Sequence, residues 1–257
     1  MSRTRRLALI ASIVTSACLI GAGSFVVVSA HTASAEDTTT AVAPTAAPVA
    51  RAQAGTTAVE VPVRDQVVSG ALGRDADADA VSFAYAGDSI TARPDSWLHV
   101  VESDPHVRAV GGYAHSGYRA DQVLHEIAPV PDADVLVVEL GTNDVNQAVP
   151  TATTIADVDA VVRKVDAHRV LVVAGPPSDW TWSKWGADRR SGQRVLSRAL
   201  RQDAEAHGWS YVDPFTELRQ ADGAWKTGTS PDGIHGTAAT NVVVARVMAA
   251  AITTAAE

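Results

Sequence analysis

Cysteine is nearly absent from this sequence: Cys18 is the only one among 257 residues. It lies within an apolar N-terminal segment that we expect to be removed as a secretory signal. The mature chain would then contain no thiol, which excludes a disulfide framework and cysteine-based catalysis. Its stability must come from a hydrophobic core, and a hydrophobic fraction of 46% is sufficient for one.

Positive charge is also scarce. The chain has 21 Lys and Arg against 29 Asp and Glu, and it lacks dense basic runs outside the extreme N-terminus. Clustered Lys and Arg are what binds nucleic acid, so this balance disfavours nucleic acid as a partner. The sequence contains no internal repeat. Its length suits one medium domain with flanking segments, and we expect a monomer.

The first 35 residues have the three parts of a signal peptide. Arginines at positions 3, 5 and 6 precede an apolar stretch over 7–28, and Ala33-Ser34-Ala35 forms a small-x-small cleavage site. We therefore predict a secreted, extracellular protein. The alternative is an uncleaved helix that anchors the protein at the cell surface, since about 20 apolar residues can span a bilayer. A membrane is a partner only in that alternative.

A linker is predicted after the signal. Residues 36–60 are rich in Ala, Thr and Pro and have few large apolar side chains, so they cannot bury enough surface to offset the entropy of ordering. We assign 36–78 to a linker and lead-in, and 79–257 to the folded domain. The acidic run 75–79 resembles the start of a calcium loop, but Ala80 and Ala86 stand where such a loop requires Gly and Glu. It is interpreted as a solvated turn.

From residue 80 onwards, short apolar runs alternate with helical segments. The runs end in turn residues and are predicted as buried strands over 81–86, 106–110, 134–140, 169–174 and 209–212. Helices are predicted near 95–103, 119–128, 152–168, 187–207 and 237–254. This alternation indicates a parallel sheet covered by helices on both faces. Such sheets carry their functional sites at the carboxyl ends of the strands.

Two polar segments contain the residues that nucleophilic catalysis requires. Gly87-Asp88-Ser89 follows the first predicted strand, and Asp232-Gly233-Ile234-His235 precedes the last predicted helix. A serine attacks an ester only when a base removes its proton, and histidine suits that task. A carboxylate three residues earlier can fix the tautomer of the histidine. Each segment alone is equally typical of an ordinary turn.

Two further segments offer hydrogen-bond donors. Gly141-Thr142-Asn143-Asp144 follows the third predicted strand, and Ser116-Gly117 follows the second. Acyl transfer needs donors where the carbonyl oxygen becomes negative, and one such donor contributes about 2.7–4 kcal/mol. The Asn143 amide and the Gly117 backbone N–H are candidates. The alternative is again a pair of turns.

Taken in order, the four segments resemble the sequence blocks of the SGNH hydrolase superfamily, the GDSL-like esterases and lipases. Those blocks read Gly-Asp-Ser, a glycine-bearing loop, Gly-x-Asn-Asp and Asp-x-x-His, and the resemblance covers roughly residues 80–257. One departure lies in the second block. The family often has Thr two residues after the glycine, where this chain has Arg119.

The resemblance implies a three-layer α/β/α sandwich with a five-stranded parallel sheet, a flavodoxin-like arrangement. It also implies that Ser89 is the nucleophile, His235 the base and Asp232 the acid that orients the base. The oxyanion hole would consist of the N–H groups of Ser89 and Gly117 and the side chain of Asn143. Neither a metal nor an organic cofactor is implied. The expected activity is hydrolysis of carboxylic esters by two-step acyl transfer.

The substrate is suggested only by location and by aromatic side chains. Trp180, Trp182 and Trp185 cluster after the fourth predicted strand, where flat indoles can stack on sugars or line an acyl pocket. Packing within the loop is the alternative. His115, beside Ser116-Gly117, is a further candidate substrate contact. Secretion favours an ester of a polysaccharide, a wall polymer or a lipid.

Two other functions stay open at this point. One is a non-catalytic glycan-binding module on the same fold, which would keep its function after Ser89→Ala. The other is an O-acyltransferase, because water and a second alcohol compete for the same acyl-enzyme.

Overall fold

The computed structural model describes residues 66–73 and 79–257, all of which belong to one folded unit, Ala58–Glu257. The predicted signal peptide over 1–35, the linker to residue 65 and most of the acidic turn at 75–79 lie outside the described residues.

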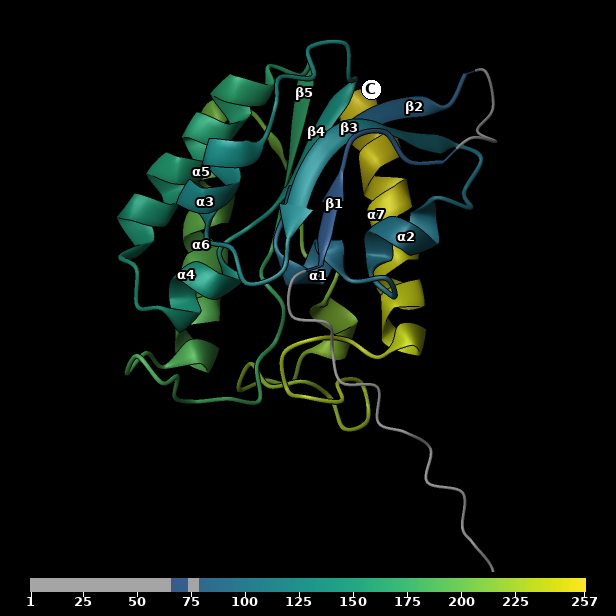
Figure 1. Ribbon diagram of the computed structural model, residues 1–257. Coiled ribbons are helices and arrows are strands. Elements are labelled where there is room, and N and C mark those ends of the chain that lie inside the picture. Colours follow the sequence, from purple (N-terminus) through teal and green to yellow (C-terminus); the bar gives the residue numbers. More distant parts are fainter. Residues whose placement is uncertain (1–65, 74–78) are drawn as a thin grey trace, which may run out of the picture. The chain divides into compact units, whose positions relative to one another are not determined.

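A single six-stranded sheet forms the centre of this unit (Figure 1). Its strands lie in the order β1-β3-β2-β4-β5-β6, and β2 to β6 are parallel. This confirms the predicted five-stranded parallel sheet, and β1 adds a sixth, antiparallel strand at the edge. The strands are β1 Val67–Ser69, β2 Val81–Gly87, β3 Val107–His115, β4 Val135–Glu139, β5 Arg169–Val173 and β6 Ser210–Val212.

Strand β1 lies within residues 36–78, which the composition assigns to a linker and lead-in before the folded domain. Val68 is paired with Ala114 of β3, and the backbone N–H of Ser116 donates to the carbonyl of Gln66 at 2.9 Å. The Tyr85 hydroxyl also donates to the carbonyl of Gly70 at 3.0 Å. The sheet therefore includes residues before position 79, and they lie against the end of β3 that leads into the Ser116-Gly117 loop.

Strand β3 is longer than its apolar run predicts. The run over 106–110 is followed by two glycines, which predict the end of the strand, but β3 continues to His115. The register between β2 and β3 shifts at Phe83 and Ala84, and the longer β3 stays paired with β2 beyond this shift. Gly112 adopts φ +137°. A side chain at Gly112 would meet the backbone of Tyr85, so only glycine fits this close approach.

Helices cover both faces of the sheet, as predicted (Figure 1). Alternate residues of each strand point to opposite faces: Val135 and Val137 join one buried cluster, Leu136 and Val138 the other. The first cluster packs α2 (Trp97–Val101) and α7 (Ala238–Ala256) against the sheet, with α1 (Ser89–Ala92) at its end. The second packs α3 (Ala120–Glu126), α5 (Thr151–Val165) and α6 (Arg189–His207). The remaining elements are α4 (Thr142–Asn146) and the 3-10 turn η1 (Thr216–Leu218).

Helix α7 is, among the described residues, the one helix long and apolar enough to cross a membrane by length and composition. In the fold, Val244, Met248 and Ile252 recur every fourth residue and are buried in the first cluster. Its apolar character is thus that of a helix packed on a sheet.

The topology places a switch point beside β2. From β2 the chain moves to β3 on one side, and from β3 it crosses to β4 on the other side of β2. The connection through α2 and the connection through α3 lie on opposite faces. Ligands in open α/β sheets bind at the carboxyl ends of the strands at such a point. The loops after β2, β3 and β4 meet there.

Candidate active site

Ser89 lies directly after β2, at the first turn of α1. The fully buried Asp88 caps this turn, because its Oδ1 accepts a hydrogen bond from the backbone N–H of Ile90 at 3.0 Å. Ser89 itself is partly exposed. A short side-chain cap followed by one helical turn therefore holds the hydroxyl at the carboxyl edge of the sheet.

His235 meets Ser89 across 146 positions of sequence. Its Nε2 is 2.9 Å from Ser89 Oγ, and its Nδ1 is 2.7 Å from Asp232 Oδ2. An ionised carboxylate only accepts hydrogen bonds, so Nδ1 carries the proton of the neutral imidazole and Nε2 is free to accept from the serine. The structure thus brings together the three residues predicted as nucleophile, base and acid.

Asp232 is held in its ionised form. Burial alone would raise its pKa, but hydrogen bonds from the His235 side chain and from the backbone N–H groups of His235 and Ile234 outweigh burial and keep the pKa well below its ordinary value. Oδ1 accepts both backbone bonds, at 2.8 and 2.9 Å, which leaves Oδ2 for the imidazole. One carboxylate therefore orders its own loop and orients the histidine.

The predicted oxyanion donors follow the neighbouring strands. Gly117 comes after β3 in the left-handed conformation, with φ +85° and open space where a side chain would be. Asn143 is the second residue of α4, after β4. Its Nδ2 donates one hydrogen to the carbonyl of Tyr118 at 2.9 Å, which leaves the second amide hydrogen for another acceptor. Within the described part of the chain, the N–H groups of Ser89 and Gly117 have no recorded partner.

Two more contacts brace the Gly117 loop against α4, and the sequence patterns did not indicate them. Arg119, the departure from the family block, donates from Nη1 to Gln147 Oε1 at 2.7 Å. Asp144 Oδ2 accepts the backbone N–H of Ala120 at 3.0 Å. Burial raises the pKa of Asp144 to about 6. The last residue of the Gly-x-Asn-Asp block is therefore a structural tie between two loops.

The sequence patterns also did not indicate that two buried acids, Asp88 and Glu139, lie close to the turn that carries Ser89. Glu139 ends β4, and its Oε2 accepts the hydroxyl of Thr91 in α1 at 3.0 Å. Burial, with the nearby charge of Asp88, raises the pKa of Glu139 well above its ordinary value. Burial likewise raises the pKa of Asp88 to about 7. Nothing in the sequence distinguishes Glu139, because its role depends on a neighbour 48 positions away.

A small cavity of about 10 Å³ opens beside Ser89 and His235, close to the least volume that holds one water molecule. Its apolar lining comes from distant segments: Ile90 in α1, Phe215 before η1, and Trp225 in the following loop. Phe215 and Trp225 are 2% exposed and pack edge to face, so this lining is rigid.

The candidate substrate contacts lie in two places. Trp180, Trp182 and Trp185 are 52%, 67% and 47% exposed in the loop after β5, so about half or more of each residue is open to solvent. His115 ends β3, and its ring lies on that of Tyr118, with centroids 3.7 Å apart. The indole N–H of Trp180 donates a hydrogen bond to the carbonyl of Asp232 in the acid–base loop at 2.8 Å.

One group of metal-ligand residues occurs among the described residues. Asp159 of α5 and Asp203 and His207 of α6 place one ligand atom each within 4.8 Å of the others. This group includes none of the residues around Ser89.

Together these contacts give Ser89 an oriented base and place free hydrogen-bond donors on the adjacent loops. Such an arrangement can deprotonate a hydroxyl, hold an acyl group and stabilise an oxyanion.

The sequence matches a known protein family over most of the folded unit. Residues 85–242 match the GDSL-like Lipase/Acylhydrolase family, a family of ester hydrolases. Among curated proteins, no significant match was found.

Solved structures share the fold at low identity. A candidate acylhydrolase from Bacteroides fragilis aligns with a TM-score of 0.57 and 16% identity, over 72% of this chain and 92% of that one. A GDSL-like lipase from Bacteroides thetaiotaomicron aligns with a TM-score of 0.56 and 16% identity, over 71% and 92%. An alpha/beta hydrolase enzyme from the metagenome of Lake Arreo gives 0.53 and 17%, over 69% and 97%. The match over residues 85–242 includes Ser89, Asn143, Asp232 and His235, and it shows that this chain belongs to the GDSL-like lipase/acylhydrolase family.

Proposed function

We propose that this chain is a secreted serine esterase that hydrolyses carboxylic esters through an acyl-enzyme on Ser89. The observation that carries the proposal is the hydrogen-bonded series Ser89–His235–Asp232, at 2.9 and 2.7 Å. Family membership supports ester hydrolysis as the reaction class. Secretion is proposed from the signal-like sequence of residues 1–35.

The proposed reaction has two steps. His235 Nε2 takes the proton of Ser89 Oγ as the oxygen attacks the ester carbonyl, and the N–H groups of Ser89 and Gly117 with the Asn143 amide stabilise the oxyanion. The His235 proton then passes to the leaving alcohol, and the acyl group stays on Ser89. Water attacks the acyl-enzyme by the same route, which releases the acid and restores the serine.

The cavity beside Ser89 favours a short acyl group. Its volume of about 10 Å³ is close to that needed for one water molecule, and a methyl group is of similar size. The exposed tryptophans after β5 supply flat apolar faces, and Trp180 contacts the loop that carries Asp232, which suits a sugar as the alcohol part of the ester. We therefore propose an acetyl-like ester of a carbohydrate polymer as the substrate class.

Turnover of p-nitrophenyl esters, from acetyl to long acyl chains, tests this proposal. We expect the parent protein to hydrolyse the acetyl ester best, and Ser89→Ala to lower kcat by at least about 10³-fold. Ser103→Ala, at an exposed serine after α2, is the matched control and should leave kcat unchanged. A folded parent protein without turnover of any ester would contradict the proposal.

A further inference from the structure

The loop that carries Asp232 and His235 has no regular secondary structure to hold it in place. Its internal hydrogen bonds include those from Gly233 N–H to Ser230 Oγ and from two backbone N–H groups to Asp232 Oδ1, and the N–H of Thr237 closes the base of the loop on the carbonyl of Thr229. These bonds fix the acid relative to the histidine. They do not fix either residue relative to Ser89, which lies on a different element, so that distance requires contacts from outside the loop.

Two consecutive residues after β5 supply such contacts. The backbone N–H of Asp179 donates to the carbonyl of Gly233 at 2.9 Å, and the indole N–H of Trp180 donates to the carbonyl of Asp232 at 2.8 Å. Gly233 adopts φ +76°, and a side chain there would meet Asp179 Cβ at 2.9 Å and Trp180 Nε1 at 3.0 Å. The two loops are thus in close contact at the carbonyl of the catalytic-acid candidate.

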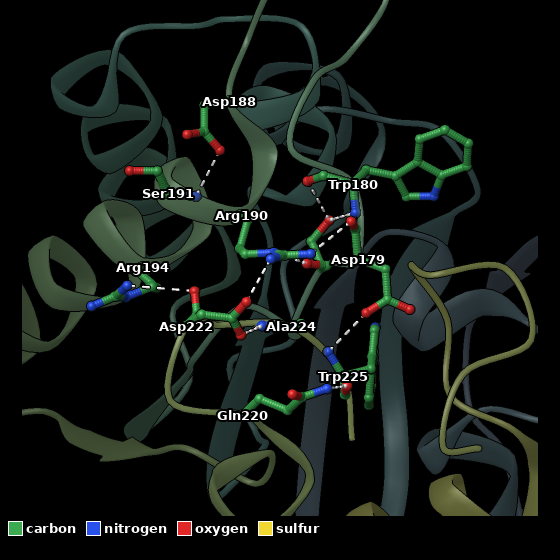
Figure 2. A network of polar contacts seen from close by, with 11 residues as sticks. Asp179, Trp180, Asp188, Arg190, Ser191, Arg194, Gln220, Asp222, Ala224 and Trp225 are labelled. Carbon is green, nitrogen blue, oxygen red and sulfur yellow. Dashed lines mark hydrogen bonds and ion pairs between the residues drawn. The ribbon is translucent and has the colours of Figure 1, made fainter. Parts of the chain in front are cut away.

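The loop that carries Asp179 and Trp180 is anchored in turn by contacts with other elements (Figure 2). Arg190 of α6 donates from Nε to the carbonyl of Ser178 at 2.9 Å and from Nη2 to the carbonyl of Asp179 at 2.8 Å. Its Nη1 pairs with Asp222 at 2.6 Å. Asp179 Oδ1 accepts the backbone N–H of Trp225 at 3.0 Å. A long helix therefore fixes the position of Asp179 and Trp180.

Trp180 combines this inward bond with an outward surface. The residue is 52% exposed although its ring nitrogen is hydrogen-bonded, and Figure 2 shows the indole directed away from the Arg190 network. A half-exposed indole held by its N–H edge is a preformed stacking surface with little freedom left to lose on binding.

We propose that Trp180 is a positioning residue for the acid–base loop and that its exposed ring binds the sugar that carries the ester. Its N–H keeps Asp232 and His235 in register with Ser89, and its face orients the alcohol part of the substrate beside the same loop. The Trp180 side chain would therefore both stack on the substrate and hold the geometry of the acid–base loop. This inference rests on the esterase function proposed above.

The test separates the two roles of the ring. Trp180→Phe keeps an aromatic face and removes the N–H donor, and Trp180→Ala removes both. Trp209→Phe is the matched control, because Trp209 stacks on His207 at the far end of α6, with ring centroids 4.3 Å apart. Values of kcat and KM are measured with p-nitrophenyl acetate and with an acetylated oligosaccharide.

For Trp180→Phe we expect kcat to fall about tenfold on both esters, with KM for the oligosaccharide within about twofold of the parent value. For Trp180→Ala we expect the same fall in kcat, and KM for the oligosaccharide about five- to tenfold higher. Trp209→Phe should match the parent.

An unchanged kcat in Trp180→Phe would overturn the positioning role, and equal oligosaccharide KM values in the two Trp180 variants would overturn the stacking role. A parent without Ser89-dependent turnover would instead reject the esterase function. Thermal unfolding of each variant verifies that the change in kcat does not come from loss of fold.

Discussion

At the scale of single residues, the proposed chemistry depends on donors that are not used up by the fold. Asn143 donates one amide hydrogen to Tyr118 and keeps one. That division lets the fold orient the amide while the second hydrogen serves the substrate. Asp232 is divided in the same way, since Oδ1 accepts the backbone N–H groups of its own loop and Oδ2 is left for the imidazole of His235.

Asn143→Ala should lower kcat by about 10²–10³-fold with little change in KM, because the lost donor acts on the charge that develops in the transition state. Steady-state kinetics with p-nitrophenyl acetate measures the effect. Asn146→Ala, on the same helix and likewise partly exposed, is the control. A similar loss in both variants would mean that disruption of α4, and not loss of the donor, is responsible.

These residues differ in how well sequence alone could identify them. Ser89, Asn143 and His235 stand in blocks with a characteristic spacing, so they were predicted. Glu139 and Asp179 have no such signature. Their contacts are with Thr91 and Gly233, on other elements, and only the folded chain brings those residues together.

At the scale of elements, the predictions succeeded where the sequence has an apolar run that ends in turn residues or a helical period. Helices α2, α3, α5, α6 and α7 and four of the five parallel strands were predicted within about three residues of their bounds, and β3 extends five residues beyond its predicted end. Strand β1 and helices α1 and α4 have three, four and five residues. None of these three segments has an apolar run or a helical period, and tertiary contacts determine them.

The contact between α6 and the loop after β5 leads to a test of stability. Arg190→Gln removes donors to Ser178, Asp179 and Asp222, and it should lower the free energy of unfolding by about 1–3 kcal/mol. Arg198→Gln, an exposed arginine on the same helix, should change it by less than about 0.5 kcal/mol. Urea unfolding measures both, and equal effects would contradict an anchoring role for Arg190.

At the scale of the whole molecule, the buried acids make stability depend on pH. Native Asp88 and Asp144 have pKa values of about 7 and about 6, against 3.8 for an ordinary aspartate. Between these limits the native state binds more protons than the unfolded chain, so the free energy of unfolding falls as pH rises through the native pKa values. Asp232 has the opposite effect on the free energy of unfolding. Its lowered native pKa contributes stability that is present above the ordinary pKa of an aspartate and is lost as pH falls toward the native pKa.

Glu139→Gln should therefore raise the free energy of unfolding at pH 8, with a smaller gain at pH 5. The amide oxygen can still accept the Thr91 hydroxyl, and the repulsion between two buried carboxylates is gone. Each pKa unit removed corresponds to about 1.4 kcal/mol. Urea titrations at the two pH values measure the change, with the exposed Glu126→Gln as control. A gain that is equal at both pH values would reject this explanation.

The central claim is that the fold activates the hydroxyl of Ser89. A fluorophosphonate tests it most directly, because an activated serine oxygen attacks phosphorus, releases fluoride and stays covalently labelled. We predict one label per chain, located on the peptide that contains Ser89 by mass spectrometry, with labelling abolished in Ser89→Ala and slowed at least about 10²-fold in His235→Ala. Absence of label on the folded parent, or a label that persists in Ser89→Ala, would contradict the claim.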